Sequence, residues 1–308
     1  MIGIDIGGAN LKVVDDAGVH IHYCPLWQGA PLADLLEPYA GPAAVVMSGE
    51  LADCFASKIE GIRWIVDAVH AVIPGAAFYG TDAAFHTRPV PDLAAANWLA
   101  SADYLREEYA DAVLLDVGST TADVIPLNRF ESLKGLTDTR RLQKHYLVYT
   151  GMLRTNVATL LSSVTLDGTV TPVSTEYFAA SADAHLVLGH ITPEDYTCPA
   201  PDNGEKTPDA ALRRLARVVC ADIDEIGKDG ALQIARQFWQ TQRTLITRAV
   251  GRALFQSDAG QVITAGIGAD LFARELDGVT LNRELGVFSD ALPAYAVREV
   301  ALRQHACD

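Results

Sequence analysis

The chain of 308 residues carries a formal net charge of −15 at pH 7, and 49% of its residues are apolar while 20% are charged. This composition indicates a globular protein that is long enough for one large or two medium domains around a substantial core. The acidic balance argues against nucleic acid as a partner, because neutralising phosphates requires clustered Lys and Arg.

The first third of the sequence predicts a hairpin-rich sheet followed by helices. Strands are expected at residues 2–6, 11–15, 19–23, 43–47 and 76–79. Apolar residues near helical period predict a helix over residues 51–70, and Asp92 is a suitable N-cap for another helix that runs through Trp98. Three hairpin strands followed by strands that alternate with helices are the order of an RNase H-like half-domain.

The second part of the sequence restarts this order at Ala112. Residues 122–126 and 130–133 predict the next two strands, and residues 135–144 form a polar connector. The remainder is mostly helical, with helices expected over residues 150–161, 174–189, 210–223, 231–255 and 294–304. Residues 193–208 are rich in Pro, Asp and Gly and predict an exposed loop, either a lid over a substrate or a plain surface connection.

These patterns predict an α/β protein of two lobes with mixed sheets flanked by helices. We expect residues 1–109 and 291–308 to form the first RNase H-like lobe, because the last helix returns to pack on it. Residues 110–290 would form the second lobe, which carries a helical insertion.

One pattern of strand, small-residue turn and strand occurs twice. It reads Ile4-Asp5-Ile6-Gly7-Gly8-Ala9-Asn10-Leu11-Lys12 in the first copy and Leu115-Asp116-Val117-Gly118-Ser119-Thr120-Thr121-Ala122-Asp123 in the second. Small residues let backbone N–H groups approach a phosphate, and a neighbouring carboxylate can hold a divalent cation that bridges phosphate oxygens. Two ordinary β-hairpins are the alternative, but the repeat favours two lobes that face each other across a phosphate-bearing ligand.

A third glycine motif, Thr264-Ala265-Gly266-Ile267-Gly268, follows an apolar run that predicts a strand. Gly266 and Gly268 would let the turn pass close to a planar ligand, either a nucleotide or a substrate, at the start of the next helix.

The ordered triple of motifs resembles the actin, sugar kinase and Hsp70 superfamily, in which the three motifs are two phosphate loops and an adenosine loop. The amino-acid sequence of the whole chain is most similar to the hydantoinase A and oxoprolinase-like family, and within it to a branch linked to tetrahydromethanopterin-dependent one-carbon transfer. The doubled motif and the stretch Glu176-Tyr177-Phe178-Ala179-Ala180-Ser181-Ala182-Asp183 carry this similarity.

The resemblance implies a transferase of methanofuran or methylofuran biosynthesis. Its substrates would be an aminomethylfuran diphosphate and a phenolic acceptor, glutamyl-tyramine or tyrosine, and diphosphate would be released. Ala9 stands where many kinases of the superfamily have a hydroxyl residue. This departure disfavours an ordinary kinase, although an ATP-dependent small-molecule kinase, an ATPase or nucleotide-sensing protein, and a hydantoinase-type hydrolase stay open as alternatives.

Neutralising a departing diphosphate is the largest catalytic task of such a condensation. The two loops are expected to bind it through Gly7, Gly8, Ala9, Asn10, Lys12, Gly118, Ser119, Thr120 and Thr121. Asp5 and Asp116 would hold Mg²⁺ directly or through water, while ATP is left open as a second cofactor. Lys12, as a strand residue, could instead point into solvent.

The phenol has an ordinary pKa of about 10 and needs a general base. The candidates are Asp123, Glu176, Asp183 and His185. Glu176 and Asp183 are two helical turns apart if residues 174–189 form one helix, so they would share a helix face. Asp123 has a strand-end role as its alternative.

The five cysteines are scattered and form no Cys-x-x-Cys pair, which is typical of the reducing cytoplasm and does not predict structural zinc. Met1 leads directly into a strand, and no apolar stretch is long enough to span a bilayer. We therefore expect a cytoplasmic protein without a membrane partner. The sequence leaves the oligomeric state open, a homo-oligomer included.

Overall fold

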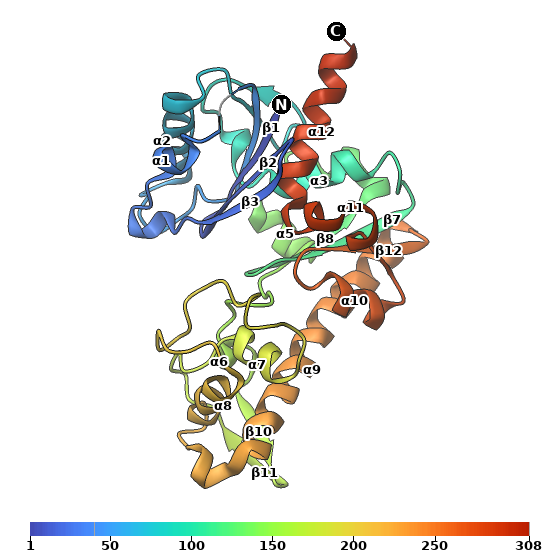
Figure 1. Ribbon diagram of the computed structural model, residues 1–308. Coiled ribbons are helices and arrows are strands. Elements are labelled where there is room, and N and C mark those ends of the chain that lie inside the picture. Colours follow the sequence, from blue (N-terminus) through green and yellow to red (C-terminus); the bar gives the residue numbers. More distant parts are fainter. Residues whose placement is uncertain (40, 308) are drawn as a thin grey trace.

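The computed structural model describes residues 1–39 and 41–307, which form two lobes and an insertion (Figure 1). The first sheet has the order β3-β2-β1-β4-β5-β6. Its strands are β1 (Ile2–Ile6), β2 (Asn10–Asp15), β3 (Gly18–Tyr23), β4 (Ala43–Met47), β5 (Ala77–Tyr79) and β6 (Phe85–His86). β1 is antiparallel to β2 and parallel to β4, so the carboxyl ends of β1 and β4 lie at one edge.

The second sheet repeats this arrangement with the order β13-β12-β7-β8-β9. Its strands are β7 (Ala112–Val117), β8 (Ala122–Pro126), β9 (Leu147–Val148), β12 (Gln261–Ala265) and β13 (Val279–Thr280). β7 is antiparallel to β8 and parallel to β12, as β1 is to its own neighbours. The expected α/β fold of two lobes with mixed sheets flanked by helices is confirmed, and each sheet centres on an RNase H-like strand order.

Helices α1 (Leu32–Leu36) and α2 (Lys58–Val72) cover one face of the first sheet around a core of aliphatic residues. The Ser57 side chain accepts a hydrogen bond from the Glu60 N–H and thereby sets the start of α2. The expected helix over residues 51–70 therefore begins later, because residues 51–56 form turns.

Helices α3 (Asn97–Leu105) and α12 (Leu292–Cys307) pack between the two sheets and join the lobes through one continuous core. α12 crosses β1 at Gly3, where a Cβ would collide with the Ala294 carbonyl oxygen. The expected N-cap Asp92 is wrong: residues Pro91–Leu93 form a 3₁₀ turn, and the Asp92 carbonyl accepts hydrogen bonds from Thr81. α3 begins after Ala96.

Two further corrections concern the segment after β8. Residues Phe130–Leu133, expected to be a strand, form helix α4 after a 3₁₀ turn at Leu127–Arg129, and β9 is the third strand of the sheet. A short apolar run cannot separate a strand from a buried helical turn. The polar connector contains helix α5 (Asp138–Lys144), which the Thr137 side chain caps.

The insertion contains α6 (Val157–Leu160), hairpin β10 (Ser163–Leu166) and β11 (Thr169–Pro172), α7 (Ser181–Val187) and α8 (Pro208–Arg217). The hairpin was not expected, and helices expected over residues 150–161 and 174–189 shrink to α6 and α7. The expected loop is confirmed, since residues 188–207 contain no helix or strand.

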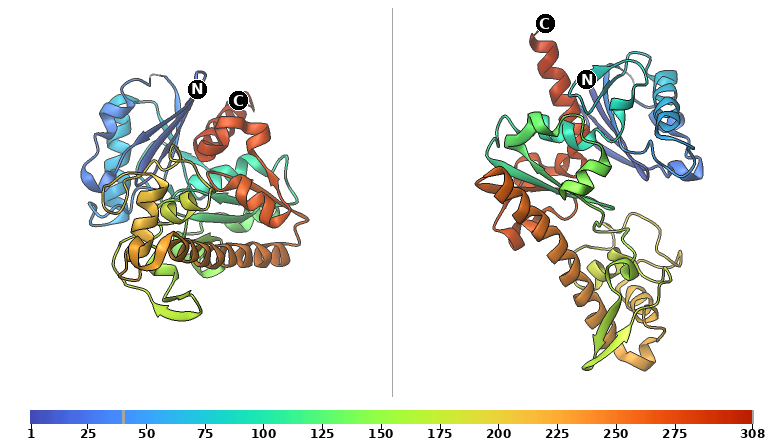
Figure 2. Two further views of the ribbon diagram at one scale, coloured as in Figure 1. Left: turned by 60° about the horizontal axis from the view of Figure 1, so that its bottom comes forward. Right: turned by 180° about the vertical axis from the view of Figure 1, so that it is seen from behind.

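Helix α9 (Ile223–Ser257) links the insertion to the second lobe, and both views in Figure 2 show its length. Its first half packs in the insertion core and its second half packs on the second sheet. The backbone leaves helical geometry at Gly227, so the helix proper begins after this residue. Helices α10 (Ala269–Leu276) and α11 (Asn282–Leu285) with two 3₁₀ turns (Leu26–Gln28, Gly286–Ala291) complete the fold.

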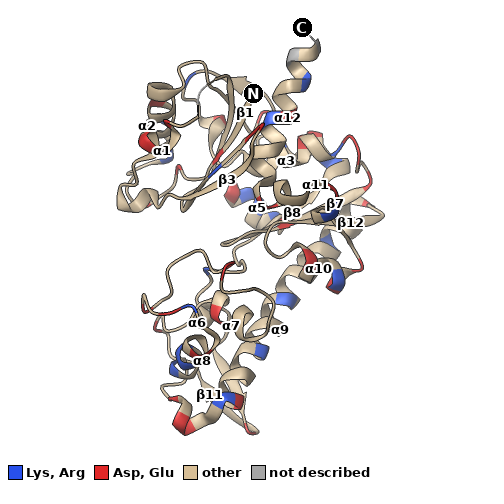
Figure 3. Cartoon of the chain, in the orientation of Figure 1, with Lys and Arg blue, Asp and Glu red and all other residues tan. Residues whose placement is uncertain are grey.

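Acidic and basic residues are scattered over both lobes and the insertion (Figure 3). Among residues 1–39 and 41–307, no helix combines the length and the apolar character that crossing a bilayer requires.

Candidate functional site

The two copies of the repeated motif form turns of the same geometry. The Gly7 N–H donates to the Asn10 carbonyl at 2.9 Å, and the Gly118 N–H donates to the Thr121 carbonyl at 3.0 Å. These two N–H groups close their own turns, so a direct contact from either to a phosphate would need the turn to open.

In each loop, a carbonyl oxygen accepts a hydrogen bond from the segment that packs against the loop. The Gly8 carbonyl accepts from the Leu26 N–H at 3.0 Å, and the Ser119 carbonyl accepts from the Leu153 N–H at 2.9 Å. In the described part of the chain, the backbone N–H groups of Gly8, Ala9, Ser119 and Thr120 donate no hydrogen bond. Both loops thus present free donors at the carboxyl ends of β1 and β7, which suits an anion.

Asp5 and Asp116 occupy equivalent positions at these strand ends. Asp5 lies opposite Lys12 on β2, and Asp116 lies opposite Asp123 on β8, so each pair shares one face of its sheet. Burial raises the pKa of Asp5 to about 6, although the charge of Lys12 opposes this shift. Burial, followed by the charge of Asp123, raises the pKa of Asp116 to about 7.

The same electrostatics show that the two lobes bring these groups together. The charges of Lys12 and Asp5 both act on Asp116, although they lie on the other sheet. Asp5 is 6% exposed, and its Oδ1 atom has no hydrogen-bond partner in residues 1–39 and 41–307. A buried carboxylate oxygen without a partner is costly, and a cation would satisfy it. Among the described residues, no group of three or more His, Cys, Asp and Glu side chains is placed to hold a metal ion.

Lys12 points toward this region and not freely into solvent. Its Nζ donates to the Asp290 carbonyl at 2.5 Å, and its charge lowers the pKa of both Asp5 and Asp116. Lys12 therefore adds positive charge beside the two carboxylates.

Asp123 forms an ion pair with the buried Arg141 guanidinium, which also donates to Asp138 Oδ1 at 2.9 Å. Burial raises the pKa of Asp123, and the Arg141 charge opposes the rise. The ion pair with Arg141 engages the Asp123 carboxylate, so this geometry favours a positioning role over that of general base.

The expectation that Glu176 and Asp183 share a helix face is wrong. Glu176 is exposed in the loop before α7, because Asp183 Oδ2 accepts from the Ala180 N–H and starts the helix there. Asp183 is buried and accepts two hydrogen bonds from Arg214, at 2.9 and 2.7 Å. Of the four candidate bases, Asp183 is therefore committed to the core of the insertion.

Gly266 and Gly268 place the third motif against the end of β7. A Cβ on Gly266 would lie 2.5 Å from Asp116 Oδ1, and its φ of 79° is in the left-handed region. A Cβ on Gly268 would lie 2.8 Å from the Val117 side chain, and its N–H donates to the Val117 carbonyl at 3.0 Å. Both glycines thus permit the close packing that positions Asp116.

Two glycines outside the repeated motif support the loops, and sequence reasoning missed both. A Cβ on Gly151 would lie 2.6 Å from the Ser119 and Thr120 backbone, and a Cβ on Gly49 would lie 2.9 Å from the Gly7 carbonyl. Each follows an apolar strand by a few residues, a weak signal that the sequence does offer.

A buried polar network fixes Gly151 from the insertion side. Gln242 Nε2 donates to the Gly151 carbonyl and to Thr150 Oγ1, both at 2.9 Å. The Gln242 Oε1 atom lies 2.8 Å from His185 Nε2. His185, a candidate base, is thus a buried structural residue that connects α7 to the second loop.

This network makes stability depend on pH. Burial, aided by the charge of His190, lowers the pKa of His185 to about 3, whereas an unfolded His has a pKa near 6.5. As pH falls from 6.5 toward 3, only the unfolded chain gains the proton, so His185 is expected to cost up to about 1.4 kcal/mol of stability per pH unit. Between pH 7 and pH 5, the free energy of unfolding measured in urea should fall less for His185→Gln than for the parent.

The matched control for this prediction is His145→Asn, since His145 is exposed and sits in a left-handed conformation that Asn accepts. It should keep the pH dependence of the parent protein. Equal pH dependence of His185→Gln and the parent would contradict the prediction.

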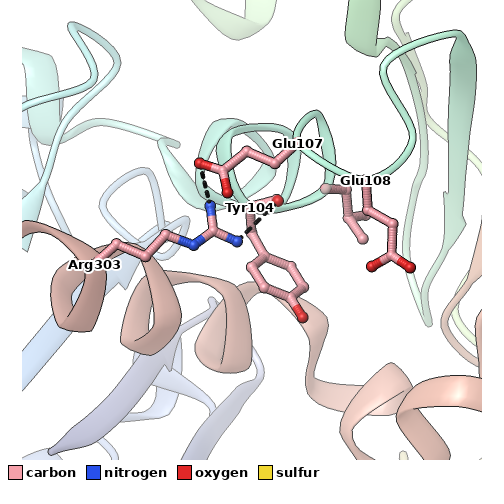
Figure 4. A pocket seen from close by; sticks show the side chains of 5 residues that line it. Tyr104, Glu107, Glu108 and Arg303 are labelled. Carbon is pink, nitrogen blue, oxygen red and sulfur yellow. Dashed lines mark hydrogen bonds and ion pairs between the residues drawn. The ribbon is translucent and has the colours of Figure 1, made fainter.

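A surface hollow of about 340 Å³ lies elsewhere, between α3 and α12, and is lined by Tyr104, Leu105, Glu107, Glu108 and Arg303 (Figure 4). Arg303 follows Arg298 along α12, and Arg298 donates a hydrogen bond to the Met1 carbonyl at the amino end of β1. Asp5 lies near the carboxyl end of the same strand. The hollow is therefore separate from the paired loops.

Comparison with known proteins found relatives along nearly the whole chain. A synthase of Methanocaldococcus jannaschii is 35% identical across 99% of this chain and 98% of its own length. A second synthase of the same name, from Methanococcus vannielii, is 32% identical across 58% of this chain and 81% of its own length. Both are named for making a furanylmethanamine that carries a γ-L-glutamylaminoethyl-phenoxymethyl group.

Among solved structures, a non-polymerising MamK mutant bound to AMPPNP aligns with 98% of this chain and 97% of its own, at 13% identity and a TM-score of 0.40. The model of the hydantoinase/oxoprolinase family matches residues 42–298. This chain belongs to the hydantoinase/oxoprolinase family.

Proposed function

We propose that this protein is a transferase that joins an aminomethylfuran-methyl diphosphate to the phenol of a glutamyl-tyramine or tyrosine acceptor. The similarity to the Methanocaldococcus jannaschii synthase along nearly the whole of both chains carries this proposal. The product named for that relative contains a phenoxymethyl furan. Its ether bond is the bond that such a condensation makes.

In this reaction the phenol oxygen forms a bond to the furan methylene carbon, and the bond from that carbon to diphosphate breaks. Diphosphate leaves with the electron pair, and the phenol proton passes to a base. The furan ring spreads the positive charge that develops on the carbon, so the protein must chiefly stabilise the leaving anion.

The paired loops supply donors for that anion. The free N–H groups of Gly8, Ala9, Ser119 and Thr120, the hydroxyls of the second loop and the Lys12 ammonium all lie at or beside the carboxyl ends of β1 and β7. Donors held in place before the reaction stabilise developing charge without further reorganisation. Thr121 and Asn10 complete the two turns.

Asp5 and Asp116 are the residues that would hold Mg²⁺. Carboxylate oxygens are ligands that Mg²⁺ prefers, and the unpartnered Asp5 Oδ1 atom leaves a place for one. The ion would neutralise diphosphate oxygens. The two carboxylates, facing each other across the lobes, would fix its position.

The product with glutamyl-tyramine or tyrosine would be an intermediate of methanofuran or methylofuran synthesis. The identity to named synthases supports this condensation over an ATP-dependent kinase. Ala9, which offers no hydroxyl to a nucleotide phosphate, is consistent with that preference.

The proposal is tested by following diphosphate release from the purified protein with Mg²⁺. We expect diphosphate only when the furan diphosphate and a glutamyl-tyramine or tyrosine acceptor are both present, with the ether product visible by mass spectrometry. Stoichiometric conversion of ATP to ADP with a furan acceptor would overturn the condensation and support the kinase.

A further inference from the structure

Glu50 is a buried carboxylate that the two loops do not use. It follows β4 at the sheet edge where the first loop lies, and Ser48 and Gly49 just before it donate to the Ile6 carbonyl. Glu50 is 1% exposed, and its Oε2 atom has no hydrogen-bond partner among the described residues. Its Oε1 atom lies 3.8 Å from Lys58 Nζ, beyond hydrogen-bond distance.

The surroundings of Glu50 connect both lobes. Burial raises the pKa of Glu50, and the charge of Asp138 on α5 adds to the rise. The backbone N–H groups of Glu50 and Ala95 and the charge of Lys58 oppose it. Ala95 has a φ of 48°, a left-handed conformation that is strained for alanine. Such strain is concentrated where ligands bind.

Two buried donors complete the same cluster. Trp98, three residues after Ala95, has an indole N–H without a partner in the described structure, and so does Nε of Arg141. The Arg141 guanidinium carbon lies 4.3 Å from the centre of the Trp98 ring, and Arg141 also binds Asp138. Pairwise links thus connect these five residues into one cluster between the lobes: Glu50 with Ala95 and Asp138, and Arg141 with Asp138 and Trp98.

Folded proteins contain few buried polar groups without partners, because each costs its full desolvation. Here one acceptor and two donors of this kind occur in one cluster. A ligand that carries an ammonium group and an oxygen acceptor would satisfy all three.

We propose that Glu50 binds the primary ammonium group of a substrate, while Trp98 and Arg141 donate to an oxygen of the same molecule. This inference rests on the proposed condensation, whose two substrates each offer such a group. The furan substrate has an aminomethyl group and a ring oxygen. A γ-glutamyl acceptor has a free α-ammonium and an α-carboxylate.

The test combines Glu50→Gln with substrate analogues that lack one amine. Glutamine keeps the size of the side chain and removes its charge. With full substrates, Glu50→Gln is expected to raise KM for one substrate by about 10- to 100-fold, as loss of a hydrogen bond to a charged group predicts. With the analogue of that substrate that lacks its amine, parent and variant should have equal KM.

The analogues also identify the substrate. A furanylmethyl diphosphate without the aminomethyl group should abolish the difference if Glu50 binds the furan. A glutaryl-tyramine should abolish it if Glu50 binds the acceptor. If Glu50→Gln does not fold, the parent alone tests the inference, because one of the two analogues must then bind about 10-fold or more weakly than its full substrate.

Thermal unfolding separates this role from a structural one. Removing the charge of a buried carboxylate whose one ion pair, to Lys58, is as long as 3.8 Å is expected to leave Tm unchanged or raise it, whereas loss of a close structural ion pair would lower it. Glu60→Gln is the matched control, because Glu60 is exposed on α2 and lies outside the cluster. It should leave both KM values unchanged.

Two results are distinguishable. A parent protein that forms ether while Glu50→Gln keeps both KM values rejects the role of Glu50 alone. A parent protein that releases no diphosphate from the two full substrates rejects the proposed function itself.

Discussion

Replacement of Asp5 or Asp116 by asparagine is expected to lower kcat by about 1,000-fold or more, because either change removes a carboxylate that would hold Mg²⁺ beside the leaving diphosphate. Each aspartate lies near the end of a central strand, and the charge of Asp5 acts on Asp116 across the two lobes. Initial rates of diphosphate release over a range of Mg²⁺ concentrations would measure the effect.

Asp53→Asn is the control for this prediction, since Asp53 is exposed in the turn before α2. It should keep the activity of the parent. Both site variants should remain folded, because asparagine avoids burying a charge where the pKa values of Asp5 and Asp116 are raised to about 6 and about 7. A folded Asp5→Asn or Asp116→Asn protein with the parent rate would remove that residue from the site.

Gly266→Ala is expected to reduce the free energy of unfolding by about 3 kcal/mol, combining a strained backbone with a steric clash. The added Cβ would lie 2.5 Å from Asp116 Oδ1 and 2.7 Å from the Val117 carbonyl oxygen, and φ at this position is 79°. Relief of the clash would move Asp116, so activity should fall as well. Urea denaturation and diphosphate release measure the two effects.

Gly251→Ala provides the matched control within α9. This glycine is exposed, has helical geometry and has no atom within 4 Å of an added Cβ. Alanine is the better helix former, so a gain of about 0.5–1 kcal/mol is expected. Equal stability of Gly266→Ala and the parent would show that the third motif can shift without cost.

The sequence predicted the order of strands and the doubled loops well, because both depend on local chemistry. Alternating apolar runs define β1 to β3, and small residues after an aspartate define each turn. It failed at Phe130–Leu133, where a buried helical turn has the same composition as a short strand. It also missed the β10–β11 hairpin, although the Asp167-Gly168 turn between the two strands is a sequence typical of a hairpin.

The candidate site was predictable in part for the same reason. Asp5, Asp116 and Lys12 belong to the repeated motif, and the fold brings them together. Glu176 was assigned to a helix face that does not exist, because the Asp183 carboxylate starts α7 five residues later. Glu50, Trp98 and Arg141 lie far apart in the chain and share no motif, so only the packed lobes reveal their cluster.

By itself, the sequence determined that this protein has two similar halves, each opening on an aspartate and a turn of small residues. The spacing of apolar residues and the residue types of a turn depend on only a few neighbouring positions, so both can be read directly from the sequence. The tertiary structure alone decided which loop N–H groups have no acceptor among the described residues, that Asp123 pairs with Arg141, and that the buried Glu50 Oε2 atom has no hydrogen-bond partner in that part of the chain. Those properties arise from contacts between distant segments, and burial and Coulomb energy depend on where such segments meet.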